Sequence, residues 1–185
     1  VTDIGDCAFL YCDSIIGFDV SEDNIAYSND EFGVLFNKDK TKLICYPMDK
    51  AGESYEIPDS VEEIGVYAFA YSTNLRQVDF PSSVTTIGAG AFMVSYIESV
   101  VLPDSVKTVG EYAFGSTTNM KYVEIGSGVE SVGDNAFDGF FSAIVLPSSL
   151  TNLAKDSIYA YGDLTIYYDG TQEQMAQLIA DEIIS

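Results

Sequence analysis

Carboxylates are the side chains of this sequence with the most scope for chemistry. Of 185 residues, 29 are Asp or Glu, 8 are Lys or Arg and none is His. Without histidine the chain can build neither a Ser-His-Asp nor a Cys-His arrangement, nor a histidine-based zinc site. Carboxylate pairs could still hydrolyse glycosides, because 29 acids always include close pairs. The composition therefore favours a binding protein over an enzyme, and it implies no cofactor.

The net charge of −21 narrows the range of partners. Such a surface repels the phosphates of nucleic acids and of anionic membranes, whereas cations and cationic partners suit it. No apolar run approaches the roughly 20 residues of a membrane helix, so membrane insertion is not expected.

Cysteine offers little further chemistry. The three residues, Cys7, Cys12 and Cys45, lack a CxxC spacing, and their odd number leaves at least one unpaired. We expect buried free thiols. A bridge between Cys7 and Cys12 is the alternative, subject to its geometry.

A repeat of 22 or 23 residues organises most of the chain. Ala-Phe recurs at residues 68–69, 91–92, 113–114 and 136–137, each time after Ile-Gly or Val-Gly. An earlier copy ends at Ala8-Phe9, and a degenerate sixth unit opens at Pro147. One unit cannot bury its apolar face, whereas stacked units can, so the repeat predicts a solenoid of leucine-rich-repeat length. A β-helix is the structural alternative, but its coils usually need more than one strand.

Each position of the repeat has a physical role. The run Leu75-x-x-Val78-x-Phe80 alternates as a strand does, and the next proline ends it by removing a ladder donor. The serine of Pro-x-Ser is expected to bond its own backbone, and the glycine to permit an approach that Cβ forbids. Ala-Phe is expected on a short helical turn, with Phe filling the interior.

Three segments together resemble the BspA-like family of leucine-rich-repeat proteins. They are the repeat P-x-S-V-x-x-I-G-x-x-A-F with its following L-x-x-V-x-[FIL], the insert Asp23–Pro47, and the closing IYYDGTQEQM of Ile166–Met175. The resemblance implies a secreted or cell-surface protein, typically bacterial, that adheres to proteins or glycans of a host or neighbouring cell. It implies no catalysis.

We therefore predict one α/β repeat solenoid over residues 1–185. It is expected to be a right-handed leucine-rich repeat with a parallel concave sheet and short helical turns on the other side. Apolar runs at Val34–Phe36 and Leu43–Tyr46 predict a β-hairpin, within an insert at about 21–54 of an irregular first repeat. Regular repeats are expected at about 55–168, and a capping box at Thr171 and Gln174 predicts a covering helix at about 171–184.

The first repeat has no such cap. We therefore expect either further sequence upstream of Val1 or self-association through this end. Four of the eight basic residues lie in or beside the hairpin, and we interpret them as guards of an edge strand rather than as a ligand site: Lys38, Lys40, Lys42 and Lys50.

Binding residues are expected where the strands leave positions free on the concave face. One column of such positions is Asp19, Glu56, Asp79, Val101, Glu124, Val145 and Tyr167. The column beside it is Gly17, Ser54, Gln77, Ser99, Tyr122, Ala143 and Thr165. Tyr122 and Tyr167 are the candidate aromatic anchors, with Asp19, Glu56, Asp79 and Glu124 as the candidate acids.

The first three acids of the column raise the question of a cation. Parallel strands lie about 4.8 Å apart, and like charges at that spacing repel by only about 1 kcal/mol in water. A solvated acidic face therefore needs no ligand. The functional alternative is a cationic partner or weak calcium binding, although no D-x-[DN]-x-[DN]-G loop is present and no metal site is assigned. Overall we expect recognition of protein or glycan, with a structural spacer inside a larger surface protein as the alternative.

Overall fold

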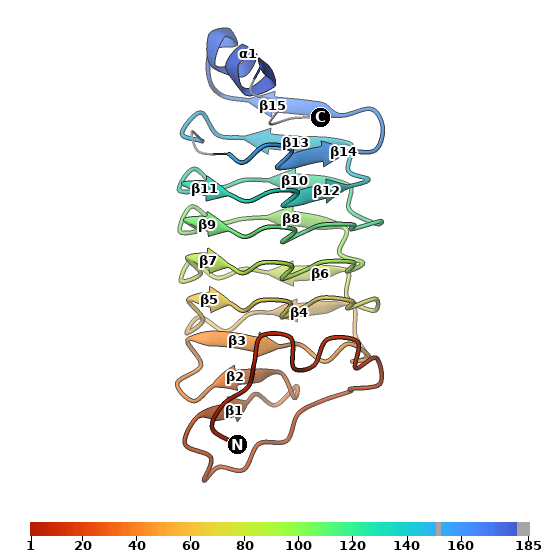
Figure 1. Cartoon of the computed structure of the whole chain (residues 1–185), viewed down its shortest axis with the longest axis vertical. Coiled ribbons are helices and arrows are strands. Elements are labelled where there is room, and N and C mark those ends of the chain that lie inside the picture. Colours follow the sequence, from red (N-terminus) through yellow and green to blue (C-terminus); the bar gives the residue numbers. More distant parts are fainter. Residues whose placement is uncertain (151–152, 181–185) are drawn as a thin grey trace.

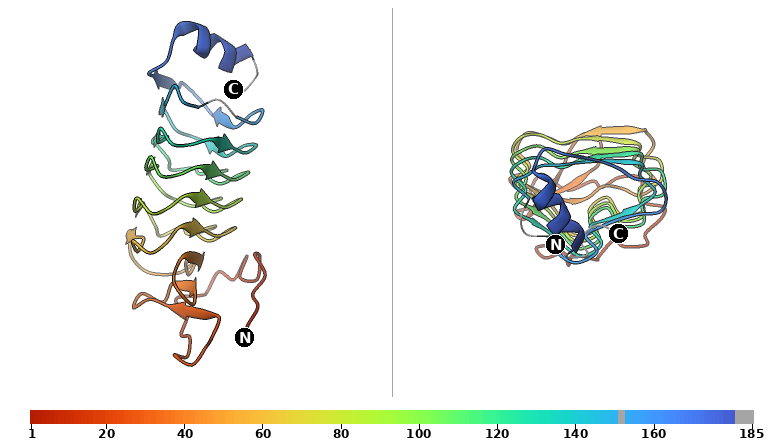
Figure 2. Two further views of the ribbon diagram at one scale, coloured as in Figure 1. Left: turned by 90° about the vertical axis from the view of Figure 1, so that its left-hand side faces the viewer. Right: turned by 90° about the horizontal axis from the view of Figure 1, so that it is seen from above.

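The chain forms a column of stacked coils, with β1 at one end and the helix α1 at the other (Figure 1). The computed structural model describes residues 1–150 and 153–180. Both side views show the coils stacked almost straight (Figures 1 and 2). The sheet formed by the strands that follow Ala-Phe, which was predicted to be concave, is therefore nearly flat. The handedness of the coil stays a prediction.

One wall of the column contains the strands that follow Ala-Phe. Two parallel sheets that contact each other through β6 and β8 build it. Their strands are β4 (Ser54–Glu56), β6 (Gln77–Asp79), β8 (Ser99–Val101), β10 (Tyr122–Glu124), β13 (Ala143–Leu146) and β15 (Thr165–Tyr168). From β4 to β10 the middle residue is buried and its two neighbours are more exposed, as the alternating pattern predicts.

A second wall contains the Ile-Gly positions, where the sequence had predicted no strand. Its seven-stranded sheet is parallel from β3 onward. Its strands are β1 (Tyr27–Asn29), β2 (Leu35–Asn37), β3 (Lys42–Cys45), β5 (Glu63–Ile64), β7 (Thr86–Ile87), β9 (Thr108–Val109) and β11 (Ser131–Val132). Each regular coil thus has two strands, which is the feature expected of the β-helix alternative. Two residues per coil were too short a run to detect by periodicity.

The Ala-Phe segments are turns, not the predicted helical turns. In the coil of Phe69, the amide of Ala68 donates to the carbonyl of Gly65 (3.2 Å), while the amide of Phe69 donates to Ala91 of the next coil (2.7 Å). Tyr67 and Tyr71 flank the pair with φ values of 55° and 61°. Left-handed residues on both sides stop a helix from propagating, and amides that bond within the turn alternate with amides that bond to the next coil. At two later repeats the chain instead pairs as β12 (Phe137–Gly139) and β14 (Ile158–Ala160).

A ladder of phenylalanine rings fills the centre of the column. Phe69, Phe92, Phe114 and Phe137 are each 0% exposed. Successive ring centroids lie 4.6, 5.0 and 5.2 Å apart, with interplanar angles of 9°, 6° and 6°. The repeat therefore places one ring per coil, nearly parallel to and stacked against the ring of the coil before it.

Two other repeat positions hold the coils close together. A Cβ on Gly110 would lie 2.5 Å from the backbone nitrogen of Ala89, so the glycine permits close approach, as predicted. For Ser60, the prediction that the serine of Pro-x-Ser bonds its own backbone was wrong. Ser60 Oγ donates to the carbonyl of Lys40 (2.9 Å), in the previous coil rather than in its own turn.

The two ends of the column differ. β2 and β3 form an antiparallel hairpin across NKDKT, and β1 adds an unpredicted edge strand. The first repeat, around Ala8, forms the same local turn as later repeats but no strand. At the other end α1 (Gln172–Ala180) lies over the last coil, and Leu178 is buried (Figure 2). The last part of the predicted helix, beyond residue 180, lies outside the described residues.

The three cysteines are free thiols, so Cys7 and Cys12 are not bridged. Cys45 is buried as expected, but Cys7 is exposed because the first repeat does not stack as a coil. No helix within the described residues is long and apolar enough to span a membrane.

Candidate interaction face

The outward residues of β4, β6, β8, β10, β13 and β15 form what we call the strand face. Strand register places Glu56 beside Asp79, and it aligns Val101, Glu124, Val145 and Tyr167 in succession. The second column runs from Ser54 to Gln77 and, in the other sheet, through Ser99, Tyr122, Ala143 and Thr165. Five of the six predicted binding residues therefore project from one wall.

Asp19 is the exception among the predicted binding residues. It lies in no strand and instead borders a hollow beside the edge strand β1, with Glu22 and Lys38. Sequence reasoning misplaced it because the first repeat does not form a regular coil. No group of three His, Cys, Asp or Glu side chains suited to a metal occurs in residues 1–150 or 153–180. The structure thus does not bring Asp19, Glu56 and Asp79 together as the weak calcium site that was the alternative to a solvated acidic face.

Hydrogen bonds along individual strands fix two polar pairs on this face. Gln77 Nε2 donates to Asp79 Oδ1 at 2.9 Å, and the Tyr122 hydroxyl donates to Glu124 Oε2 at 2.7 Å. The second bond raises the pKa of Tyr122, because ionisation would place a phenolate against a carboxylate. Both acids are thereby oriented along the face, with acceptor capacity left for a ligand.

The strand face changes character along the column. Its first two strands present Glu56 and Asp79, whereas the later strands present exposed apolar surface. Val101 is 53% exposed and Tyr167 is 57% exposed. Exposed apolar side chains beside oriented carboxylates suit recognition of a ligand with both apolar and hydrogen-bonding surface.

The dimensions of the face limit what it can bind unaided. Six strands at about 4.8 Å spacing span about 24 Å, and positions i and i+2 on a strand are about 7 Å apart. A standard protein interface takes about 800 Å² from each partner. A narrow linear ligand, such as an extended peptide or a glycan chain, therefore fits the strand face alone, whereas a globular partner must also contact neighbouring turns.

One end of the face opens into a groove that the sequence did not reveal. Its volume is about 720 Å³, and its lining includes Glu56, Asp59, Phe32 and Lys50. Lys50 Nζ lies 5.4 Å from the ring centroid of Phe32, in cation–π geometry. Phe32 comes from the insert, so only the folded hairpin region brings it to Glu56.

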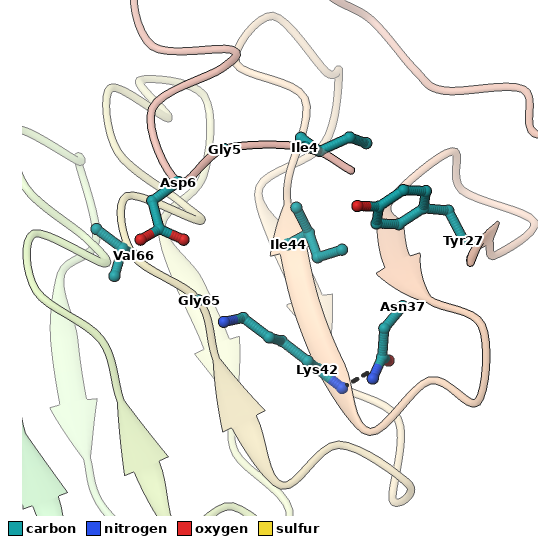
Figure 3. Close-up of a pocket in the computed structure, with 9 residues that line it drawn as sticks. All are labelled: Ile4, Gly5, Asp6, Tyr27, Asn37, Lys42, Ile44, Gly65 and Val66. Atoms are coloured by element: carbon teal, nitrogen blue, oxygen red, sulfur yellow. Dashed lines mark hydrogen bonds between the residues drawn. The ribbon is translucent and has the colours of Figure 1, made fainter. Parts of the chain in front are cut away.

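A smaller pocket of about 190 Å³ lies on the other wall, where residues 4–6 cross in front of β3 and β5 (Figure 3). Ile44 and Tyr27 supply apolar surface, and Asp6 and Lys42 are its charged residues. Lys42 Nζ is already paired with Glu63 Oε1 at 2.7 Å. Asp6 is then the remaining charged group of this pocket, and the smaller volume makes the pocket the weaker candidate.

Comparison with known families agrees with the repeat. A family model described as the BspA type leucine rich repeat region matches residues 45–165 in six copies. The chain belongs to this BspA-type family. Comparison with curated proteins gave no match.

Solved structures of several bacterial proteins share the fold of this chain. The pneumococcal vaccine antigen PcpA is 25% identical, with a TM-score of 0.68 over 90% of this chain and 48% of its own. A leucine rich cell surface protein from Faecalibacterium prausnitzii is 27% identical, with a TM-score of 0.66 over 83% of this chain and 40% of its own. A leucine-rich repeat protein from Eubacterium ventriosum, at 23% identity and a TM-score of 0.67, covers 84% of this chain and 43% of its own and shows the fold alone. The chain thus spans less than half the length of each of these structures.

Proposed function

We propose that this chain is a non-catalytic recognition module of a secreted or cell-surface bacterial protein, and that it binds a protein or glycan along the strand face. The observation that carries the proposal is the exposure of Val101 and Tyr167 on a rigid wall whose buried positions are fixed by stacking. The two similar structures described as a cell surface protein and a vaccine antigen support the compartment.

The chemistry of the strand face supports a ligand with mixed surface. Tyr122 and Glu124 lie in adjacent outward positions, and Tyr167 is two strands further along the column. Aromatic residues dominate the affinity of many interfaces, since they bury a large area at low entropic cost. Tyr167 is therefore the proposed anchor, and Glu124 is the proposed hydrogen-bond acceptor.

The test is a binding screen against a glycan array and a panel of host matrix proteins. For any ligand found, Tyr167→Ala should weaken binding at least tenfold, because it removes the most exposed aromatic side chain of the face. Tyr159→Ala is the matched control, since Tyr159 is 37% exposed on β14, outside the strand face. Its loss should change affinity less than twofold.

Two results would contradict the proposal. Equal weakening by Tyr159→Ala would place the ligand elsewhere on the column. A wild-type chain with no selective ligand across both panels would favour the second candidate function, a structural spacer. The straight, continuously hydrogen-bonded column is the observation that favours that alternative.

A further inference from the structure

A separate recess lies where the N-terminal segment meets the first regular coil. Its volume is about 370 Å³, and its lining is Tyr11, Asp13, Met48, Asp49, Tyr71 and Thr73. Met48 is buried, whereas both aspartates are exposed and Tyr11 is 66% exposed. The recess thus combines a buried apolar residue with aromatic and acidic ones, and none of its residues belongs to the strand face.

Two tyrosines form the aromatic part of this recess. The ring centroids of Tyr11 and Tyr71 lie 5.1 Å apart at an angle of 56°, and their hydroxyl oxygens are 3.4 Å apart. That hydrogen bond raises the pKa of Tyr71 to about 12, so the Tyr71 ring remains neutral at physiological pH. The face of a neutral phenol ring carries negative electrostatic potential and attracts organic cations.

The two aspartates add unneutralised charge. Neither Asp13 nor Asp49 forms an ion pair in the part of the chain that the structure describes. The neighbouring cations have other partners: Lys50 lies over the ring of Phe32, and Arg76 lies over Tyr96 and donates to the carbonyl of Thr73 at 3.0 Å. The amide of Asp49 donates to Ile15, which ties the N-terminal segment to this position.

We propose that this recess receives a lysine or arginine side chain of a partner protein. The aliphatic part of such a side chain matches Met48, while its cationic end meets the tyrosine rings and the two carboxylates. The net charge of −21 attracts a basic partner toward the whole surface, and the recess supplies local selectivity. This inference is independent of the strand face, so either can fail without the other.

The test is a titration of the ¹⁵N-labelled chain with short peptides at low salt, in which binding is monitored through the amide chemical shifts in NMR spectra. The probes are the blocked pentapeptides acetyl-GGKGG-amide and acetyl-GGRGG-amide, with norleucine in place of lysine as the neutral control. We expect saturable shifts centred on residues 11–13, 48–49 and 71–73 with the cationic peptides only. The response should weaken at higher ionic strength, because salt screens exposed charges.

Matched variants separate the contributions that the aromatic ring, the carboxylate charges and the size of the side chains make to binding. Tyr11→Phe keeps an aromatic face and should bind within twofold of wild type, whereas Tyr11→Leu should bind at least threefold more weakly. Asp13→Asn with Asp49→Asn should weaken binding at least fivefold. Asp23→Asn with Asp163→Asn makes the same charge change at exposed sites elsewhere and should have little effect.

Several outcomes would overturn the inference. They are the same shifts with the norleucine peptide, no localised shifts with either cationic peptide, or equal weakening by the distant pair of substitutions. All four aspartates that are changed to asparagine are exposed, so each variant should remain folded. A preserved amide spectrum checks this.

Discussion

Stacking of the phenylalanine ladder should contribute stability beyond the burial of each ring. The test is a double-mutant cycle on Phe92 and Phe114, whose centroids are 5.0 Å apart at 6°. Each Phe→Leu change keeps an apolar side chain in a site that is 0% exposed. Each single change should lower the free energy of unfolding by about 1–2 kcal/mol through lost volume and contacts.

The two changes should not be additive. An aromatic pair contributes about 0.5–1.5 kcal/mol beyond its buried area, and either single change already removes that contribution. The double variant should therefore be less destabilised than the sum of the singles by this amount. Phe92 with Phe137 is the matched control, because Phe114 lies between them, and its coupling should stay within about 0.5 kcal/mol of zero.

The free energies are measured by urea unfolding. Unfolding is monitored by circular dichroism and by the fluorescence of the 13 tyrosines, since the chain has no tryptophan. Coincident curves from the two probes are required, because solenoids can unfold in parts. Equal coupling energies for the adjacent and the separated pair would refute the reasoning. In that case the ladder would be a consequence of repeat spacing and would add nothing to burial.

Two other properties of the column lead to predictions. Gly110→Ala should destabilise the chain by about 1–3 kcal/mol in thermal melts, because the new Cβ would lie 2.5 Å from the backbone nitrogen of Ala89. Gly5→Ala should be nearly neutral, because nothing lies within 4 Å of a Cβ at that position. Equal shifts in melting temperature for the two variants would contradict the close-approach explanation. Burial raises the pKa of Cys45 from 9.0 to about 12 and that of Tyr46 from 10.0 to about 12. Because the folded-state pKa values are the higher ones, this stabilisation is complete below pH 9 and is lost as the pH rises toward 12. The melting temperature should therefore fall over that range, and Cys45→Ala or Tyr46→Phe should make the fall less steep; an unchanged slope in both variants would argue against burial as the cause.

Sequence periodicity predicted the regular coils well, because every coil repeats the same local constraints. Ala-Phe, the glycine before it and the strand centred on Val78 each occupy the place that the spacing gave them. The second wall was missed, because two residues such as Thr86 and Ile87 carry no readable alternation. The helical turn was wrong because left-handed residues such as Tyr67 are not visible in a side-chain pattern.

The candidate sites were likewise predicted in part from the sequence and missed in part. The columns of the strand face followed from the repeat, since parallel register carries a position from one coil to the next. Asp19 was misplaced because the first repeat lacks stacked neighbours on which such register depends. The groove of Phe32 and the recess of Tyr11 were missed because both join segments that no periodicity relates.

By itself the sequence determined the repeat, the inward ring of each coil and the outward positions that stacking leaves free, because these depend on spacing alone. Tertiary structure decided the strands of the second wall, the irregular path of the first repeat and the contact of Tyr11 with Tyr71, which are 60 residues apart. Such contacts form where irregular segments pack against the column. Their geometry is set by the surfaces that meet, and a local pattern in the chain contains no record of it.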